Sequence, residues 1–169
     1  MHSINKYTSR QREFTFIELK NDFIKATFMD YGATIISIFT NDFQGNSESI
    51  LMAYESLGSY KKNKMYLNAT IGPFSGRIKD SKFVLNGEEI LLDSNFLETV
   101  NIHGGKESIA FKFFDYTIEE TKEYSKLTFK YRKKAKTSKF PGNQLFTITY
   151  TLFEDSLLME FSATTDQDT

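Results

Sequence analysis

Apolar and polar residues alternate with a period of two in segments spread along almost the whole chain. The alternation begins at Phe14 and returns over residues 24–28, and segments at 126–133, 146–152 and 157–163 repeat it. A period of two places every second side chain on one face, as in a half-buried β-strand. The 17 Phe and 9 Tyr also suit such a pleated surface. Without a long amphipathic helix or an internal repeat, the pattern predicts an all-β protein, either an antiparallel sandwich or a barrel.

Local signals interrupt this alternation. Asn86-Gly87 lies between two strand-like runs and predicts a tight β-hairpin, because both turn positions need a positive φ. An i, i+3 spacing of Tyr and Leu predicts a short surface helix within residues 52–64. Residues 1–13 are polar and are expected to form a weakly ordered N-terminal tail, which leaves 14–169 as the folded domain.

Charge and composition exclude several classes of function. The 21 basic and 22 acidic side chains give a net charge of −1, whereas binding nucleic acid by charge needs a basic face. With no Cys and two His, neither a disulfide framework nor a zinc site built on several His is expected. No apolar run approaches the roughly 20 residues of a transmembrane helix, and the N-terminus lacks a signal-peptide core. A cytoplasmic protein without a membrane partner is therefore expected.

A basic run near the C-terminal third allows two interpretations. It consists of Arg132, Lys133 and Lys134, followed by Lys136 and Lys139. The run could be a nucleic-acid patch or a solvated loop. The solvated loop is favoured, because the chain as a whole is not basic.

His103 is the most informative single residue for chemistry. It lies in a Gly-containing segment, 101–105, between strand-like runs, and functional residues concentrate in such loops. A neutral imidazole both donates and accepts a hydrogen bond, and it titrates near neutral pH. On the residues alone, His103 is either a functional histidine or one that caps a turn.

Arg77 is the second candidate. It follows Gly72-Pro73-Phe74-Ser75-Gly76, in which Gly and Pro would shape the backbone that presents the guanidinium group. Arginine offers five donors and no acceptor, which suits hydroxyl and carboxylate partners. The alternative is a surface ion pair with Asp80 or Glu88, a common contact that contributes about 0–1 kcal/mol.

Six short motifs together resemble a known family. In order along the chain and at about the family's spacing, they match the N-terminal half of the aldose 1-epimerases, also called galactose mutarotases. The matching segments are Tyr31–Ile35, Ile71–Ile78, Phe83–Gly87, Asn101–Gly105, Phe140–Asn143 and Ala163–Asp166.

The resemblance implies a galactose mutarotase-like β-supersandwich that interconverts the α and β anomers of a free hexose such as galactose or glucose. In such enzymes a Glu takes the proton from the anomeric hydroxyl, while a His protonates the ring oxygen. This acid–base ring opening needs no metal or other cofactor. By the resemblance, Arg77 contacts sugar hydroxyls. His103 corresponds to the first of two family histidines and assists beside the ring oxygen.

The chain also departs from the family pattern. The family usually has Arg-Tyr-Ala-Asn before its Arg, whereas residues 73–76 here are Pro, Phe, Ser and Gly. The family's second His and its Glu base would lie beyond Thr169. We therefore expect a truncated sandwich that is inactive alone. Its last strand, near the C-terminus, would leave a sheet edge and an apolar face open for a homodimer or another association.

Two other classes of function stay open. A non-catalytic carbohydrate-binding β-sandwich would keep Arg77 and an aromatic platform such as Phe74, without an acid or a base. A structural or interaction domain would instead use the Lys-rich surface at 132–139. Neither alternative predicts the His103-Gly104-Gly105 segment downstream of Arg77.

Overall fold

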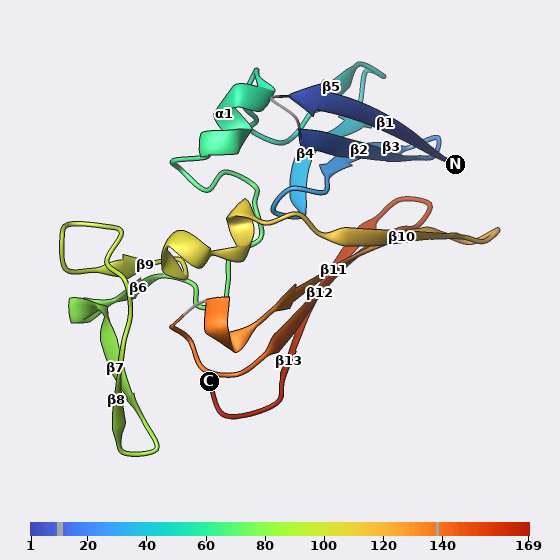
Figure 1. Cartoon of the computed structure of the whole chain (residues 1–169). Coiled ribbons are helices and arrows are strands. Elements are labelled where there is room, and N and C mark those ends of the chain that lie inside the picture. The colour runs from blue at the N-terminus through green and yellow to red at the C-terminus, as the bar shows by residue number, and fades with distance from the viewer. Residues whose placement is uncertain (10–11, 138) are drawn as a thin grey trace.

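Two antiparallel β-sheets face each other in this chain, with a smaller group of strands at one end (Figure 1). The computed structural model describes residues 1–9, 12–137 and 139–169. The predicted antiparallel sandwich is confirmed, and the described sheets do not close into a barrel.

The first sheet comes from the N-terminal quarter of the chain. Its five strands are ordered as in the sequence, and each is antiparallel to the next. They are β1 (His2–Ser9), β2 (Arg12–Lys20), β3 (Ile24–Met29), β4 (Thr34–Asn41) and β5 (Ser47–Ser49).

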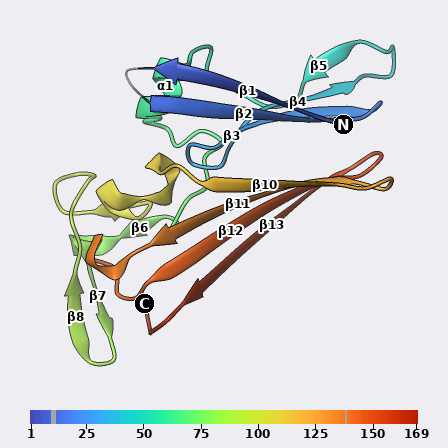
Figure 2. The ribbon, with the colours of Figure 1, turned by 45° about the vertical axis from the view of Figure 1, so that its right-hand side comes forward.

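The second sheet comes from the C-terminal third. Its strands are β10 (Asp115–Glu120), β11 (Ser125–Lys133), β12 (Gln144–Leu152) and β13 (Leu157–Thr165), again antiparallel and in sequence order. Figure 2 shows them fanning away from the first sheet, with β10 nearest and β13 farthest. The period-two pattern at 126–133, 146–152 and 157–163 therefore located β11, β12 and β13 correctly.

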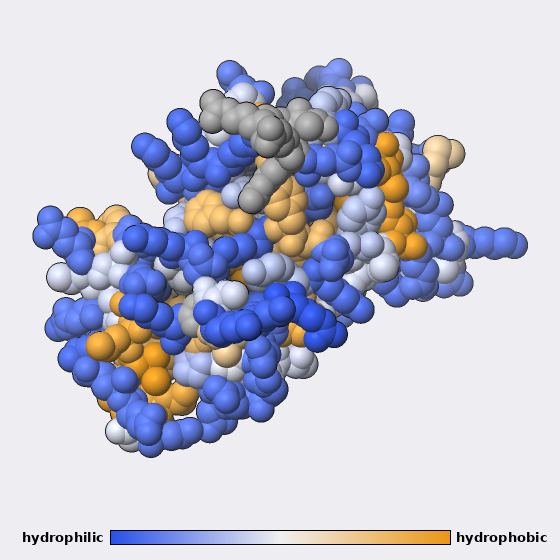
Figure 3. All heavy atoms as spheres, viewed as in Figure 1, coloured by the Kyte–Doolittle hydropathy of each residue, from blue (hydrophilic) through white to orange (hydrophobic). Residues whose placement is uncertain are grey.

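Shorter elements connect the sheets. They are α1 (Leu57–Lys62), β6 (Arg77–Ile78) paired with β9 (Asn101–Ile102), the hairpin of β7 (Lys82–Leu85) and β8 (Glu88–Leu91), and 3₁₀ turns at Lys79–Ser81, Gly105–Glu107, Ile109–Phe111 and Ala135–Thr137. Both the predicted helix and the predicted Asn86-Gly87 hairpin are confirmed. Figure 3 shows hydrophobic side chains over the hairpin, where Val84 and Leu91 are exposed.

The core lies between the two sheets. β2 and β3 contribute Leu19 and Phe28, and β11 and β12 contribute Phe129 and Tyr150, all of which are buried. The rings of Phe28 and Tyr150 lie 4.5 Å apart across the sandwich, and the Tyr150 hydroxyl donates to the Ala33 carbonyl oxygen at 3.0 Å. Full burial of one such large side chain stabilises the fold by about 1.5–3 kcal/mol.

The weakly ordered tail predicted over residues 1–13 is wrong for residues 2–9, which form β1. This strand pairs with β2 along its whole length, for example Ile4 with Ile17. An edge strand can be polar because backbone hydrogen bonds, rather than two buried faces, hold it in the sheet. A side-chain contact between Lys6 and Glu13, at 2.6 Å, adds to the pairing. Residues 10 and 11 lie outside the described residues.

The first strand of the second sheet, β10, begins only at Asp115. A 3₁₀ turn, Ile109–Phe111, comes first, and the Ser108 hydroxyl caps it by accepting from the Ala110 amide at 3.3 Å.

No helix among the described residues is both long and apolar enough to cross a membrane.

Lys133 is an unusual member of the sandwich interior. Its side chain is 2% exposed, and its ammonium group donates to the Phe140 carbonyl oxygen at 3.4 Å and faces the Phe140 ring at 5.8 Å. Among the described residues, no carboxylate lies within ion-pair distance of it. Burial lowers the pKa of Lys133 to about 8, although the negative charge of Glu107 acts in the opposite direction.

Replacing Lys133 by Met should raise the free energy of unfolding at pH 7 by roughly 1–3 kcal/mol, because a desolvated charge is removed while the volume is kept. The advantage should shrink as the pH rises through about 8 toward the ordinary lysine pKa. In that window the folded wild-type protein holds a neutral amine, whereas the unfolded chain still binds the proton. Urea unfolding followed by circular dichroism measures both effects.

The neighbouring Lys134 is exposed, so Lys134→Met is the matched control and should change stability by no more than about 0.5 kcal/mol. A loss of stability in Lys133→Met, with Lys134→Met unchanged, would show that the buried ammonium group stabilises the fold.

Candidate functional site

The two residues singled out from the sequence lie next to each other. β6 and β9 pair with Arg77 opposite Ile102, so His103 follows directly after the paired residue. Two hydrogen bonds then join His103 to the residue before Arg77. The His103 amide donates to the Gly76 carbonyl oxygen at 2.9 Å, and the Gly76 amide donates to His103 Nδ1 at 3.2 Å.

This pairing fixes which nitrogen of His103 is available. Because Nδ1 accepts a hydrogen bond, a neutral ring carries its proton on Nε2. The pKa of His103 is lowered, first by burial and then by the positive charge of Arg77. At neutral pH the ring is therefore neutral and offers one N–H donor.

Glycines around His103 allow the chain to turn sharply here. His103 itself has φ of 55° and Gly104 has φ of 83°. A Cβ at Gly104 would lie 2.5 Å from the Gly72 carbonyl oxygen, so only glycine fits between the two loops. The Gly-flanked loop noticed in the sequence thus brings the segment after β9 against the segment before β6.

Aromatic rings support both candidate side chains. The ring of Tyr66 lies 4.7 Å from that of His103, and the guanidinium carbon of Arg77 lies 5.3 Å from the centre of the Phe96 ring. Asn95 holds this arrangement together, since its side chain accepts from the Ile102 amide at 2.8 Å and donates to the Ile102 carbonyl at 3.0 Å.

Sequence reasoning missed Tyr66, Asn95 and Phe96. None of them belongs to an alternating run or to a Gly-rich motif, so the sequence carries no signal for them. The surface ion pair considered for Arg77 is not formed, because within the described residues no carboxylate pairs with its guanidinium group.

A hollow of about 420 Å³ lies beside Arg77. Its lining includes the rings of Phe74, Phe83 and Phe140, together with Gln144 and Thr169. Phe74 is 44% exposed, as expected for an aromatic platform. His103 is not among the described residues that line this hollow. Arg77 therefore shares the hollow with Phe74, while His103 lies next to Arg77 through the pairing of β6 with β9.

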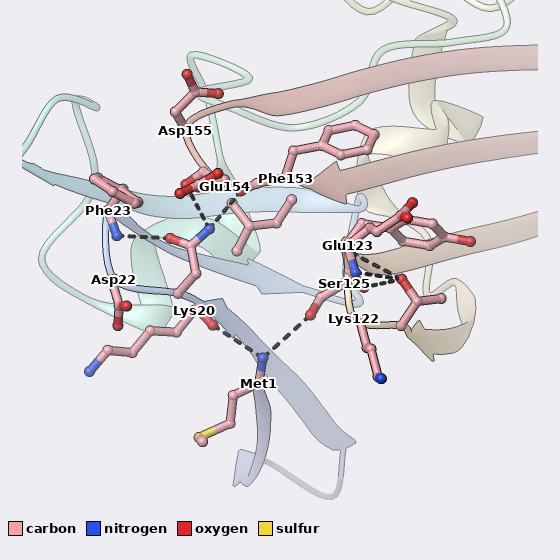
Figure 4. Close-up of a pocket in the computed structure, with 14 residues that line it drawn as sticks. Met1, Lys20, Asp22, Phe23, Lys122, Glu123, Ser125, Phe153, Glu154 and Asp155 are labelled. Carbon is pink, nitrogen blue, oxygen red and sulfur yellow. Dashed lines mark hydrogen bonds between the residues drawn. The ribbon is translucent and has the colours of Figure 1, made fainter.

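A larger hollow, of about 610 Å³, lies at the opposite end of the sandwich, near the N-terminus (Figures 1 and 4). Some of its polar groups join neighbouring segments of the chain. The Asn21 side chain donates to the carbonyl oxygens of Phe153 and Glu154 at 2.6 and 2.9 Å, and the Met1 ammonium group donates to the Lys20 carbonyl at 3.2 Å. We interpret this hollow as a structural junction.

The part of the chain that the structure describes contains no group of three or more His, Cys, Asp or Glu side chains arranged to hold a metal ion. The chemistry available at Arg77 and His103 is that of a cation and a neutral imidazole. Together they can bind hydroxyl groups and donate a hydrogen bond to an oxygen atom.

Comparison with known proteins identifies the family. The model of the family described as "Aldose 1-epimerase" matches residues 15–169. The chain belongs to the aldose 1-epimerase family. This confirms the resemblance inferred from the six motifs.

Individual relatives agree with the family match. The chain is 32% identical over 160 residues to an aldose 1-epimerase of Haemophilus influenzae, covering 92% of this chain and 44% of that protein. It is 30% identical over 142 residues to a maltose epimerase of Levilactobacillus brevis, covering 83% of this chain and 41% of that one. The chain thus spans less than half the length of these two curated relatives.

Solved structures confirm the fold. The galactose 1-epimerase of Lactobacillus acidophilus superposes with a TM-score of 0.84 at 22% identity, over 99% of this chain and 49% of that one. A galactose mutarotase-like protein of Clostridium acetobutylicum gives 0.77 at 15% identity, over 96% and 49%. The galactose mutarotase-like sandwich predicted from the sequence is therefore present.

The charge of Arg77 should be measurable in the titration of His103. Arg77→Ala should raise the pKa of His103, because a nearby positive charge is lost, but the pKa should stay below 6.5 because burial remains. Ring resonances followed by NMR against pH, with His2→Gln for assignment, give the two pKa values.

Lys106→Ala is the control, since it removes an exposed cation close in sequence that does not act on the His103 ring. If Arg77→Ala leaves the titration unchanged, the guanidinium group does not face the imidazole in solution.

Proposed function

We propose that this chain provides the Arg77–His103 part of an aldose 1-epimerase site that interconverts the anomers of a free hexose. The observation that carries the proposal is the direct juxtaposition of the two residues, with His103 neutral and its Nδ1 already bonded. Family membership supports the same reaction class.

In the proposed reaction, the sugar ring opens and closes again by acid–base steps. A base removes the proton of the anomeric hydroxyl, the bond between C1 and the ring oxygen breaks, and an acid protonates that oxygen. The Nε2–H of His103 would donate a hydrogen bond beside the ring oxygen, where negative charge develops. Arg77 would hold sugar hydroxyls through its guanidinium donors.

The proton-transferring residues are a separate part of the proposal. By the family resemblance they are a second His and a Glu, and we propose that neither is among these 169 residues. His2, the other histidine, lies on β1, and its Nδ1 is 3.0 Å from a carboxylate oxygen of Glu120 on β10. Figure 1 shows β1 far from β6 and β9. We propose that the chain alone binds a hexose without accelerating its mutarotation.

A second candidate function is sugar binding without catalysis. The observation that favours it is that Phe74 and Arg77 line the same hollow. An exposed aromatic ring can pack against the apolar C–H groups of a sugar, while a guanidinium group donates hydrogen bonds to its hydroxyls. The two candidates share Arg77 but differ in whether His103 contributes.

Polarimetry on freshly dissolved α-glucose and α-galactose tests the catalytic part. With the chain alone, the optical rotation should change at the spontaneous rate, because positioned acid–base groups normally supply a factor of about 10²–10⁴ each. A faster rate that disappears in His103→Ala would contradict the proposal that this chain is inactive alone.

Titration calorimetry with galactose tests the binding part. Arg77→Ala and His103→Ala should each weaken binding by about tenfold, equivalent to the loss of one or two hydrogen bonds. Lys79→Ala, an exposed cation beside β6, should leave binding unchanged. An effect of Phe74→Ala and Arg77→Ala without any effect of His103→Ala would favour the non-catalytic function.

A further inference from the structure

Tyr66 contacts the ring of His103, yet the proposed reaction gives this tyrosine no part. The centres of the two rings lie 4.7 Å apart, and their planes meet at 59°. The Tyr66 ring also lies 5.3 Å from that of Phe111, in the 3₁₀ turn whose first residue, Ile109, belongs to the main core. Tyr66 therefore connects the imidazole to a turn that is anchored in the sandwich.

The backbone that carries Tyr66 has an unusual conformation. Its φ is 54°, in the left-handed region that bulky side chains disfavour. Asn63, which is 2% exposed, holds the turn in place. Its carbonyl oxygen accepts from the Tyr66 amide at 2.8 Å, and its side-chain oxygen accepts from the Leu67 amide at 2.7 Å. Strained residues persist only where surrounding contacts impose them, and they cluster at functional sites.

The residues that follow Tyr66 are bonded to the first sheet and its β3–β4 turn. The Asn68 carbonyl oxygen accepts from the Ile35 amide at 3.2 Å, and the Thr70 amide donates to the Gly32 carbonyl oxygen at 2.8 Å. Figure 1 shows this segment running from α1, beside the first sheet, to β6. The position of the Tyr66 ring is thus determined by the sheet and is independent of the loop that carries His103.

The imidazole of His103 needs such an external contact to keep one orientation. The Gly76 amide fixes the direction of Nδ1, but one hydrogen bond of 3.2 Å lets the ring tilt around it. The Tyr66 ring restricts this tilt, because the two rings are in contact. The Asn95 side chain, which brackets Ile102, also donates to the Tyr66 hydroxyl at 3.5 Å. The Nε2–H group is then held in one direction.

We propose that Tyr66 is a positioning residue for His103, and that its ring keeps the Nε2–H group of the imidazole directed at the ring oxygen of the sugar. Tyr66 acts through the imidazole and transfers no proton itself, since burial raises the pKa of its hydroxyl. The inference rests on the proposed function for the identity of the acceptor, but not for the orientation of the imidazole.

The Gly76 amide and the titration of His103 report this orientation in NMR experiments. In Tyr66→Leu, which removes the aromatic ring, the Gly76 amide should exchange hydrogen at least about tenfold faster, because its bond to Nδ1 opens more often. The pKa of His103 should rise toward its ordinary value of 6.5, because the ring is less buried. Tyr66→Phe keeps the ring and should restore both values, with exchange within about twofold of the wild type.

Tyr54→Leu is the matched control. Tyr54 is also half-buried and lies 5.1 Å from another ring, that of Tyr60, but it belongs to the cluster beside α1. It should change neither the exchange of the Gly76 amide nor the pKa of His103. The same changes in Tyr54→Leu as in Tyr66→Leu would show a general loosening of the fold and would overturn the inference.

A measurement on the unaltered chain covers the case in which Tyr66→Leu does not fold. The order parameter of the His103 Cε1–H bond, from carbon relaxation, should be close to the value for rigid backbone, about 0.85. A value below about 0.6 would mean that the imidazole reorients freely beside Tyr66, which contradicts a positioning role.

Calorimetry with galactose tests whether Tyr66 acts through His103. Tyr66→Leu should weaken binding by about three- to tenfold, and adding it to His103→Ala should cause no further loss. Additive losses would show that Tyr66 contacts the sugar or supports another part of the site, and they would overturn the positioning role.

The readouts separate this inference from the proposed function. If the chain binds no galactose but Tyr66→Leu changes the Gly76 exchange and the His103 titration as expected, the proposed function fails and the orienting contact stands. If Tyr66→Leu leaves both unchanged, or Tyr66→Phe alters them equally, the ring of Tyr66 does not orient the imidazole, whatever the sugar does.

Discussion

The packing of aromatic rings between the two sheets is the contact on which the remainder of the molecule depends. Phe28 from the first sheet meets Tyr150 from the second, and Phe129 joins them from β11 at 6.2 Å from Tyr150. The hydroxyl of Tyr150 reaches the Ala33 carbonyl, so the contact is polar at its end as well as apolar along its length. These few side chains fix how the N-terminal and C-terminal strands face each other.

The candidate site is attached to that core through the loop before β6. The Gly72 carbonyl accepts from the Ile109 amide at 3.1 Å, and a Cβ at Gly72 would lie 2.8 Å from the Ile109 side chain. Ile109 belongs to the main core. Because Gly72 is held there, the following turn presents Arg77 and receives His103 at positions set by the sandwich. Exposed loop residues thereby gain a rigid support.

Sequence reasoning located most strands, because alternation is a local property of each segment. It failed at β1, where the pairing with β2 depends on backbone hydrogen bonds that side-chain patterns do not record. It found Arg77 and His103 through motifs, but it missed Tyr66 and Phe96, which reach the site only after the chain has folded. It also found the alternation over 157–163, but the exposure of Met159 and Phe161 in that segment follows only from the order of strands in the folded sheet.

The hydrogen bond from the Gly76 amide to His103 Nδ1 has a consequence for acidic conditions. If the ring takes up a proton, Nδ1 becomes a donor and faces the amide N–H, so one of the two must turn away. The loop that carries Arg77 would then lose one of the two bonds that tie it to the segment after β9. Protonation of a single imidazole is thus linked to the backbone conformation of the loop that carries Arg77.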